Sequence, residues 1–488
     1  MTEQEQIAHL YRRLGFGLSP AEASVASKLG RDGVISRLIH FDGVDEEFAV
    51  SPWSFCWEEG QTDIYLDSFR PAFHWSLRLA MTQRPLQEKL TLFWHDHFAV
   101  SGEKVETGPM MLAYLETVRR GCAGKFGDLL KSVSREPAMC QWLDTTANLA
   151  GHPNENFARE VLELFTIGIG NYSETDVKEA ARAFTGWGIR YVVFEPGAEN
   201  LQATAKAWVA ESRPMITYAF SPDLHDSGPK TILGRTQNWT GEEVLAHLAS
   251  HPKTSQLIAG KLWGFFGSGH ASPEATTAMA ATFTSTGGDI RQTLLTMVKH
   301  PEFWAEKHVR SIIKSPVDFV VPILRQTGLP AFLRPAATQN QDRMKPPVKV
   351  LRDIAGAVFF LTSQQGMQLL FPPDVDGWPS GQEWISSANM THRAGLPKLL
   401  LGVDTDQGGA GLVLAQLLAG GAPKSSEEIV AKLISIFDAN LPAEKVRLLV
   451  DACEKAGGAA SLASANVAAP MLAAVLTPLF ASPEFQFC

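Results

Sequence analysis

The chain has few of the features that mark several large classes of protein. Its five cysteines are widely scattered, so neither a thiolate zinc site nor a disulfide framework is indicated. No stretch approaches the roughly 20 apolar residues needed to span a bilayer. No run of lysine or arginine occurs, and the net charge of −9 argues against binding to nucleic acid or to an anionic membrane surface.

Several enzyme signatures are missing as well. The absence of a GxGxxG motif after a strand and of a Walker A motif argues against nucleotide-dependent chemistry. The absence of a GxSxG elbow argues against an α/β-hydrolase mechanism, and HExxH is also lacking. The first residues are acidic and form no signal peptide, which favours a cytoplasmic location; a periplasmic or exported location would require a leader that has been removed.

Helical periodicity dominates what is present. With 488 residues, 45% of them hydrophobic, and a mean hydropathy of −0.04, the chain can bury a large core. The pattern predicts a mainly α fold with a multi-helix, bundle-like core and long ordered loops. Two β-rich runs, 189–194 and 215–220, predict a small antiparallel β ribbon near 189–220.

Changes in composition predict the domain organisation. We expect a main helical domain over 1–401 that carries a β-ribbon insert at 189–235. The Pro-rich, polar stretch 328–348 predicts a mobile loop. The Gly/Ala-rich stretch 402–424 predicts a linker, and 425–488 predicts a C-terminal helical subdomain.

The segment Pro153–Gly170 is the most informative part of the chain. Its proline suits a first helical turn, and its glycines suit a C-terminal stop. At about 100° per residue, one face of this helix carries Asn156, Arg159, Glu160 and Glu163. Such a face is either solvated, with an Arg159–Glu163 pair, or the wall of a ligand site.

The segment Phe93–Phe98 contains a His-x-His pair, a spacing that is common among metal ligands. If the preceding helix continues through it, His95 and His97 point about 200° apart. Only a break near residue 95 would direct both rings to one site. The alternative is a buried, hydrogen-bonded histidine at the end of an aromatic helix.

Two further segments combine polar and aromatic residues in turns. His225–Lys230 places a histidine, a carboxylate and a lysine where loops often carry function, although Asp226 also suits a turn cap. Phe371–Trp384 is fixed by proline and glycine and contains two tryptophans. This loop either lines a pocket, for example for a sugar ring, or packs over the helical core.

These motifs resemble the bacterial domain-of-unknown-function 1800 family along the whole chain and in the same order. The matching segments are LYRRLGFG at 10–17, FWHDHFAVS at 93–101, NENFAREVLELFTIGIGNYSETDVKEAARAFTGW at 154–187, HDSGPKTILG at 225–234, KSP at 314–316, PPDVDGWPSGQEWI at 372–385 and SPEFQ at 482–486. The family name assigns no activity, but motifs rich in His, Glu, Asp, Asn and Trp imply a site.

The residues at these motif positions lead to a first hypothesis, a metal-dependent oxidative or hydrolytic enzyme. Mixed nitrogen and oxygen ligands suit Fe, Mn or Zn, and a metal-bound water would be activated by a nearby base. The expected metal ligands are His95, His97, Glu160 and His225. The expected catalytic residues are Glu155, Glu163, Asp226 and Lys230. The residues expected to contact a bound cofactor are Trp187 and Trp378.

Two other hypotheses stay open. One is a carbohydrate-active enzyme in which Glu160 with Glu163 or Asp226 forms an acid–base pair across a groove. The other is a non-catalytic helical binding or assembly protein in which the motif residues form a buried polar network. The expected partner is a small molecule or a polymer and not a nucleic acid, and the sequence sets no oligomeric state. Convergence of the motif residues around a cavity would favour an enzyme.

Overall fold

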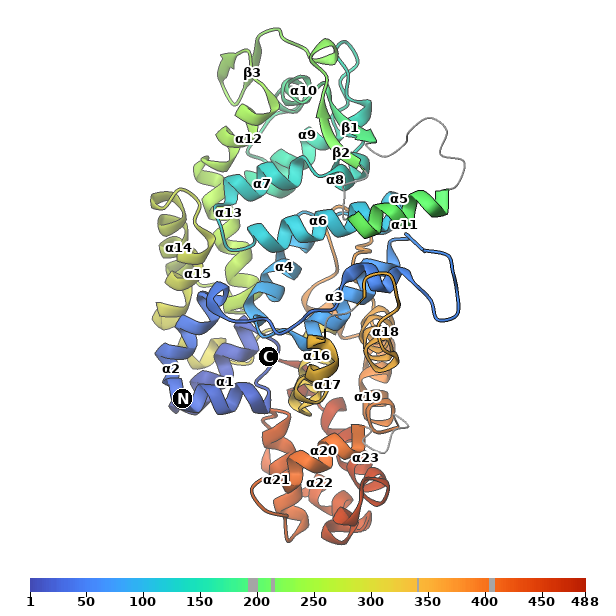
Figure 1. Cartoon of the computed structure of the whole chain (residues 1–488). Coiled ribbons are helices and arrows are strands. Elements are labelled where there is room, and N and C mark those ends of the chain that lie inside the picture. The colour runs from blue at the N-terminus through green and yellow to red at the C-terminus, as the bar shows by residue number, and fades with distance from the viewer. Residues whose placement is uncertain (192–200, 212–215, 340–341, 403–408) are drawn as a thin grey trace.

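The computed structural model describes residues 1–191, 201–211, 216–339, 342–402 and 409–488, and it is built mainly from helices (Figure 1). The first half of the chain contains α1 Glu3–Leu14, α2 Pro20–Ile39, α3 Phe69–Met81, α4 Pro85–His97, α5 Gly102–Val105, α6 Gly108–Gly121, α7 Phe126–Ser134, α8 Pro137–Trp142, α9 Asn156–Glu160, the π-helix η4 Val161–Thr166, α10 Glu174–Ala183, α11 Leu201–Glu211 and α12 Gly241–Ala249. The predicted mainly α fold is confirmed.

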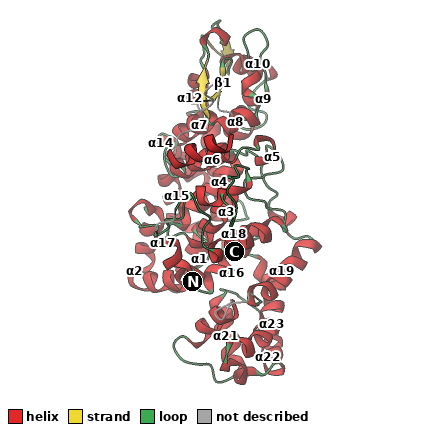
Figure 2. Cartoon of the chain, turned by 45° about the vertical axis from the view of Figure 1, so that its right-hand side comes forward, coloured by secondary structure: helices red, strands yellow, loops and turns green. Residues whose placement is uncertain are grey.

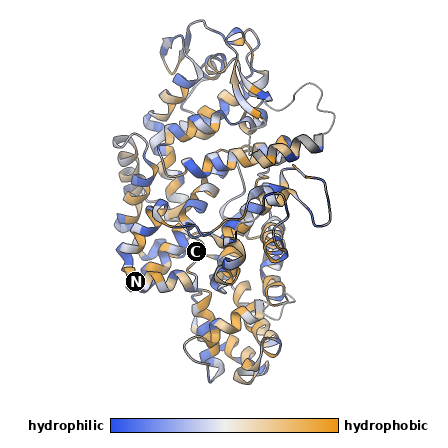
Figure 3. Cartoon of the chain, viewed as in Figure 1, coloured by the Kyte–Doolittle hydropathy of each residue, from blue (hydrophilic) through white to orange (hydrophobic). Residues whose placement is uncertain are grey.

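The second half continues in the same way. It contains α13 Pro252–Leu262, the π-helix η6 Trp263–Gly267, α14 Pro273–Ser285, α15 Ile290–Lys299, α16 Pro316–Gln326, α17 Leu329–Thr338, α18 Lys349–Ser363, α19 Ser387–Leu401, α20 Gly409–Leu418, α21 Ser426–Ile436, α22 Ala443–Lys455 and α23 Ala465–Ala481. In the part of the chain that the structure describes, no helix has the length and apolar character needed to cross a membrane. Most helices carry both hydrophobic and hydrophilic stretches (Figure 3), as expected for helices with one buried face.

The strands gather at one end of the molecule (Figure 2). β1 Trp187–Tyr191 pairs antiparallel with β2 Ile216–Phe220, with Trp187 opposite Phe220. β3 Lys230–Ile232 pairs with β4 Arg235–Gln237 in a second two-stranded hairpin. The predicted β ribbon is therefore confirmed, although residues 192–194 and 215 of its expected strands lie outside the described residues.

A central layer of helices holds the functional segments. α3 packs against α6, α16 and α18, and α4 packs against α6. Glu88 of α4 is fully buried and accepts hydrogen bonds from Arg119 Nε at 2.8 Å, Arg78 Nε at 2.9 Å and Trp75 Nε1 at 3.0 Å. Because a buried carboxylate is stable only when its charge is compensated, this network fixes α3, α4 and α6 in one arrangement.

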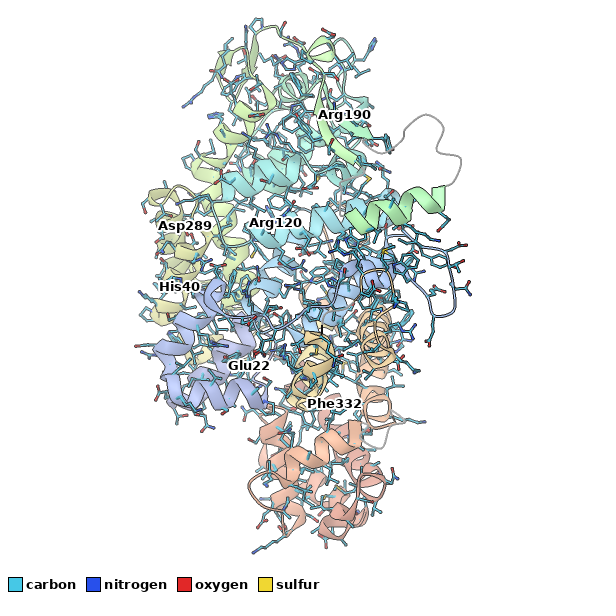
Figure 4. All side chains as sticks on the ribbon, viewed as in Figure 1. Glu22, His40, Arg120, Arg190, Asp289 and Phe332 are labelled. Atoms are coloured by element: carbon cyan, nitrogen blue, oxygen red, sulfur yellow. The ribbon has the colours of Figure 1, made fainter. Side chains whose placement is uncertain are left out.

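A second buried ion pair connects the N-terminal helices to this layer. Glu22 of α2 (Figure 4) accepts a hydrogen bond at 2.6 Å from the guanidinium of Arg325 on α16. The same guanidinium donates to the carbonyl of Thr82 at 2.9 Å. Residues near positions 20, 80 and 325 are thereby held together in the interior.

Two segments that composition predicts to be loop or linker contain helices. In the predicted mobile loop 328–348, α17 buries Leu329, Leu333 and Ala337, which are spaced four residues apart on one face. Its first proline lies in the first turn, where proline is tolerated. In the predicted linker 402–424, of which residues 403–408 lie outside the described residues, α20 buries a similar apolar face. Composition was misleading here because apolar spacing, not proline or glycine content, decides whether such a segment is helical.

The C-terminal helices form the end of the molecule opposite the strands (Figure 1). α23 packs against α19, α20 and α22, and the loop after it contacts the central layer through a bridge between Phe487 and Ile313. The region predicted as a separate subdomain, 425–488, thus shares packing with the preceding helices. The division of the chain into 1–401, 402–424 and 425–488 stays a prediction.

Candidate functional site

A cavity of about 730 Å³ lies beside the C-terminal end of α4. Its walls also include α13, η6, the segment 311–318 and the loop 376–384. The polar side chains that line it include Asp96, His97, Lys261, Ser268, His270 and Asp376, and the aromatic ones include Phe93, Phe265, Trp378, Trp384 and Phe487. Apolar walls with a few converging polar groups are typical of a small-molecule site.

α4 continues without a break through the His-x-His segment and ends at His97. The two histidines therefore face different surroundings, as the helical alternative predicts. His97 lines the cavity, and its Nε2 donates to the carbonyl of Phe165 at 3.2 Å. Its Nδ1 lies 3.1 Å from Nζ of Lys261. Burial, reinforced by the charge of Lys261, holds the pKa of His97 well below its ordinary value, so the ring is neutral.

His95 lies behind the cavity wall. Its ring stacks between Trp75 and Trp378, with centroid distances of 5.5 Å and 5.1 Å. Burial lowers its pKa to about 3, and neither ring nitrogen has a hydrogen-bond partner among the described residues. The ring therefore serves as a neutral aromatic spacer, which differs from the hydrogen-bonded histidine expected from the sequence.

Asp96, between the two histidines, fastens the loop of the fourth motif to α4. Its Oδ1 accepts a hydrogen bond at 2.8 Å from the backbone N–H of Trp378. The contact depends on Gly377, which has a φ of 93° and whose added Cβ would lie 2.3 Å from Oδ1 of Asp96. Burial raises the pKa of Asp96 to about 6 and lowers the pKa of Lys261.

The helix predicted over Pro153–Gly170 begins at Asn156 as α9 and continues as the π-helix η4 to Thr166, so Pro153 precedes the helix and does not lie in its first turn as expected. Its last turn faces inward, because the carbonyls of Leu164 and Phe165 accept hydrogen bonds from Lys261 and His97. These bonds satisfy carbonyls that a helix end leaves without partners. The helix therefore supports the site through its last carbonyls, although none of the described residues 153–170 lines the cavity itself.

The charged residues of this helix divide between solvent and interior. Arg159 pairs with Glu155 at 3.3 Å and with Glu174 at 2.7 Å, and not with Glu163 as the solvated-face alternative expects. Glu163 accepts a hydrogen bond from the hydroxyl of Tyr172. Glu160 is buried, and burial together with the charges of Glu163 and of Asp376 in the cavity wall raises its pKa to about 7.

The third motif forms a turn at the strand end of the molecule. Asp226 binds the guanidinium of Arg182 through both carboxylate oxygens, at 2.7 Å and 3.2 Å. Nδ1 of His225 donates to the carbonyl of Thr185 at 2.9 Å, and Lys230 donates to the carbonyl of Gly228 at 2.9 Å. These contacts attach the turn to α10. The side chains of this motif bond to Arg182 of α10, to Thr185 just beyond that helix and to one another, and none of them lines the cavity.

Trp187 belongs to the same end of the molecule. It begins β1, and its ring packs edge-on against Phe184 at 5.2 Å and against Tyr218 at 5.2 Å. Trp378, the other tryptophan expected to contact a bound group, lies in the cavity wall.

The family comparison accounts for nearly the whole chain. A family model described as "Protein of unknown function (DUF1800)" matches residues 9–487. The chain belongs to the DUF1800 family. No curated protein and no solved structure matches it. The DUF1800 match extends across every residue of the cavity, from Leu92 to Phe487.

In this DUF1800 chain the four expected metal ligands lie in four different surroundings. His97 faces the cavity, His95 lies behind Trp378, Glu160 approaches Asp376, and His225 lies in the turn on α10. Among the described residues, no group of three or more His, Cys, Asp or Glu side chains is arranged to hold a metal ion.

Sequence reasoning missed the partners that complete the DUF1800 cavity. Lys261 lies on α13 beside the buried residues Ile258 and Leu262, and a lysine within such an apolar pattern could have indicated an inward-facing charge. Asp96 and Asp376 belong to motifs that were recognised, but other residues of those motifs were expected to act. No sequence signal pairs α4 with α13, because their contact depends on the tertiary fold.

Proposed function

We propose that this chain is a hydrolytic enzyme that binds a small polar molecule in the cavity beside His97 and acts on it by acid–base catalysis. The observation that carries the proposal is the convergence of Asp96, His97 and Lys261 on one wall of that cavity. Ionisable groups gathered and partly desolvated in a cleft are a recurring feature of active sites.

The protonation states of these groups suit proton transfer near neutral pH. The pKa of Asp96 is raised to about 6 and that of Glu160 to about 7, and the pKa of Lys261 is lowered. A general acid or base works best when its pKa lies near the pH at which the enzyme operates. Asp96 and Lys261 line the cavity, as does Asp376, whose charge contributes to the raised pKa of Glu160.

The cavity walls favour a substrate with an apolar face. Phe93, Phe265 and Trp378 supply aromatic surface, and the volume of about 730 Å³ is that of sites for drug-sized ligands. Aromatic walls also suit a sugar ring, so a carbohydrate remains within the proposed substrate class. The presence of a cavity next to the polar motif residues is the feature that favours an enzyme over an assembly protein.

The test is hydrolysis of a panel of chromogenic esters, anilides and glycosides by the full chain. We expect turnover of at least one class, reduced roughly 100-fold by Lys261→Met, which keeps the length of the side chain and removes its charge. Lys253→Met, on the exposed side of the same helix α13, is the matched control and should retain full turnover. Absence of turnover for every class by the folded chain would contradict the proposal.

The metal-dependent form of the hypothesis stays a separate prediction. The orientation of His97 is compatible with it, because a histidine whose Nε2 donates to a carbonyl presents Nδ1 as a ligand. That nitrogen faces the amino group of Lys261, which would have to move aside for Fe, Mn or Zn to bind there. Elemental analysis of the purified chain, with turnover measured before and after chelation, tests this form.

A further inference from the structure

Three residues outside the recognised motifs form a hydrogen-bonded series that reaches the cavity. Ser268 follows η6 directly, and its Oγ lies 2.6 Å from Nδ1 of His308. Nε2 of His308 lies 2.9 Å from a carboxylate oxygen of Glu302. Of the three, Ser268 lines the cavity. Glu302 lies in the 3₁₀ turn Pro301–Trp304 and His308 in the 3₁₀ turn Glu306–His308, and Ser268 is the C-cap residue of η6.

The hydrogen-bond chemistry fixes the direction of this series. Glu302 accepts hydrogen bonds from Lys307 and His308, which lower its pKa to about 2 and keep it ionised. An ionised carboxylate only accepts, so Nε2 of His308 carries the proton and donates to it. In the neutral ring Nδ1 then carries the lone pair, and the hydroxyl of Ser268 donates to it. A histidine that accepts from a serine and is oriented by a carboxylate has the roles of a nucleophile–base–carboxylate triad, here with the two ring nitrogens exchanged relative to the serine-protease arrangement.

We infer that Ser268 is a nucleophile for acyl transfer, with His308 as its general base and Glu302 as the group that orients His308. The substrate class is an ester or amide whose carbonyl enters the cavity. The inference rests on the proposed function in one respect, namely that the cavity binds the substrate. It does not depend on the carboxyls of Asp96 or Glu160.

The chain around Ser268 is held rigidly, as a nucleophile requires. Gly269 passes so close to the next segment that an added Cβ would lie 2.3 Å from the carbonyl of Ser311. An added Cβ at Gly267 would lie 2.7 Å from the ring of Trp263. Side chains at either position would displace the loop, so both glycines allow the close approach that sets Ser268 against His308.

Arg13 of the first motif supports the same arrangement from α1. Its guanidinium is buried and donates to the carbonyl of His308 at 2.5 Å and to Oγ of Ser311 at 3.1 Å. Ser311 in turn lies 3.1 Å from Oγ of Ser268. Arg13 is thus a positioning residue, and this contact gives a role to a motif that the acid–base proposal does not use.

Water is the only reactant that this reaction needs besides the ester or amide substrate. The oxygen of Ser268 attacks the carbonyl carbon while its proton passes to Nδ1 of His308, and the carbon–oxygen or carbon–nitrogen bond to the leaving group then breaks. The leaving alcohol or amine takes the proton from His308, which leaves an ester on Ser268. Water then attacks this ester with His308 again as base, releasing the carboxylic acid and restoring Ser268.

A purely structural serine would make similar bonds, since Oγ of Ser268 also accepts from the backbone N–H of His270 at 2.9 Å. Reactivity separates the two roles. The full chain is incubated with a fluorophosphonate probe, and the modified peptide is identified by mass spectrometry. We expect the label on Ser268 and its loss in Ser268→Ala. Ser285, an exposed serine at the end of α14 that does not line the cavity, is the control, and Ser285→Ala should label as the wild type does. Ser380, an exposed serine that lines the cavity, provides the accessible comparison for the cysteine variants.

Two further variants distinguish an activated serine from an accessible one. Glu302→Gln should slow labelling roughly 100-fold, because the orienting charge is lost while the carbonyl oxygen of the amide still accepts from His308. The Ser268→Cys variant should react with iodoacetamide at pH 6 at least about ten times faster than Ser380→Cys, because His308 favours the thiolate. All five native cysteines are buried, so their own reaction with iodoacetamide should be slow.

The outcomes separate this inference from the proposed function. Labelling of Ser268 without turnover of any substrate would contradict the proposed function alone. Turnover that survives in a folded Ser268→Ala variant would contradict the assignment of Ser268 as the nucleophile, but not the proposed function. Equal labelling of the wild type and Ser268→Ala, or a Ser268→Cys thiol no faster than that of Ser380→Cys, would assign the serine a structural role.

Discussion

Nζ of Lys261 donates to Nδ1 of His97 across 3.1 Å, while Nε2 of the same ring donates to the carbonyl of Phe165. An ammonium group has no lone pair, so these two contacts select one neutral tautomer of His97. They also join α13, α4 and η4 at a single ring. The site thus has a cation placed between a neutral imidazole and the carboxylates of Asp96 and Asp376.

Removing the charge of Lys261 should separate activity from stability. In Lys261→Met we expect the roughly 100-fold loss of turnover described above, with a change of about 1 kcal/mol or less in the free energy of unfolding. The cost of burying the ammonium offsets much of what its hydrogen bonds contribute. Urea unfolding monitored by circular dichroism provides the measurement. A much larger loss of stability, with unchanged turnover per folded molecule, would make Lys261 a structural residue.

Glu160 should make stability depend on pH between about 4.5 and 7. Its pKa is raised from 4.5 to about 7 in the folded chain, so the folded state keeps a proton that the unfolded state releases in this interval. The free energy of unfolding therefore falls as the pH rises, by up to about 3 kcal/mol. Urea unfolding at pH 5 and pH 8 should show a smaller difference for Glu160→Gln than for the wild type. Glu103→Gln, exposed on α5, is the control and should leave the pH dependence unchanged.

Gly377 should be intolerant of alanine. The new Cβ would clash with Oδ1 of Asp96 at 2.3 Å and with its backbone carbonyl at 2.8 Å, in addition to the strain of a positive φ. We expect Gly377→Ala to destabilise the chain by about 2–4 kcal/mol and to reduce turnover, because the Asp96–Trp378 bond sets the cavity wall. Gly381 also has a positive φ but open space around it, so Gly381→Ala should cost only about 1 kcal/mol. Equal effects of the two changes in thermal unfolding would show that the Asp96 contact is unimportant.

Asp226 should prove structural. Asp226→Asn weakens the two-point bond to Arg182 at a partly exposed position, so we expect a loss of about 1 kcal/mol in the free energy of unfolding and unchanged turnover per folded molecule. Asp223→Asn, on the exposed turn just before it, should change neither quantity. The opposite pattern, lost turnover at full stability, would favour the catalytic role that the sequence predicts for Asp226 and Lys230.

The helices could be predicted from sequence because their information is local. The apolar spacing and the glycine stop over Pro153–Gly170 lie within the segment itself, and the geometry of a continuous helix already separates His95 from His97. The inward side of the 153–170 helix became clear only with its partners. Lys261 and His97 contact this side from positions about 100 and 70 residues away in the sequence. Helical periodicity does not predict such long-range contacts.

The serine series shows the same limit more strongly. Ser268, His308 and Glu302 have no fixed spacing, and each lies in or beside a short π or 3₁₀ turn rather than in a long periodic helix. Their proximity depends on how η6 packs against the two turns, and on Arg13 from the other end of the chain. Motif reading selects residues that are close in sequence, whereas this site joins residues that are close only after folding.

The cavity wall extends from Leu92 to Phe487, and this span has a consequence for biosynthesis. A ribosome releases the chain from its N-terminal end, so α4 with His97 emerges long before the strand-like contact between Phe487 and Ile313 can form. During translation the aromatic lining of the cavity has no complete cover. This wall of the cavity therefore cannot close until nearly 400 residues after His97 have been added to the chain.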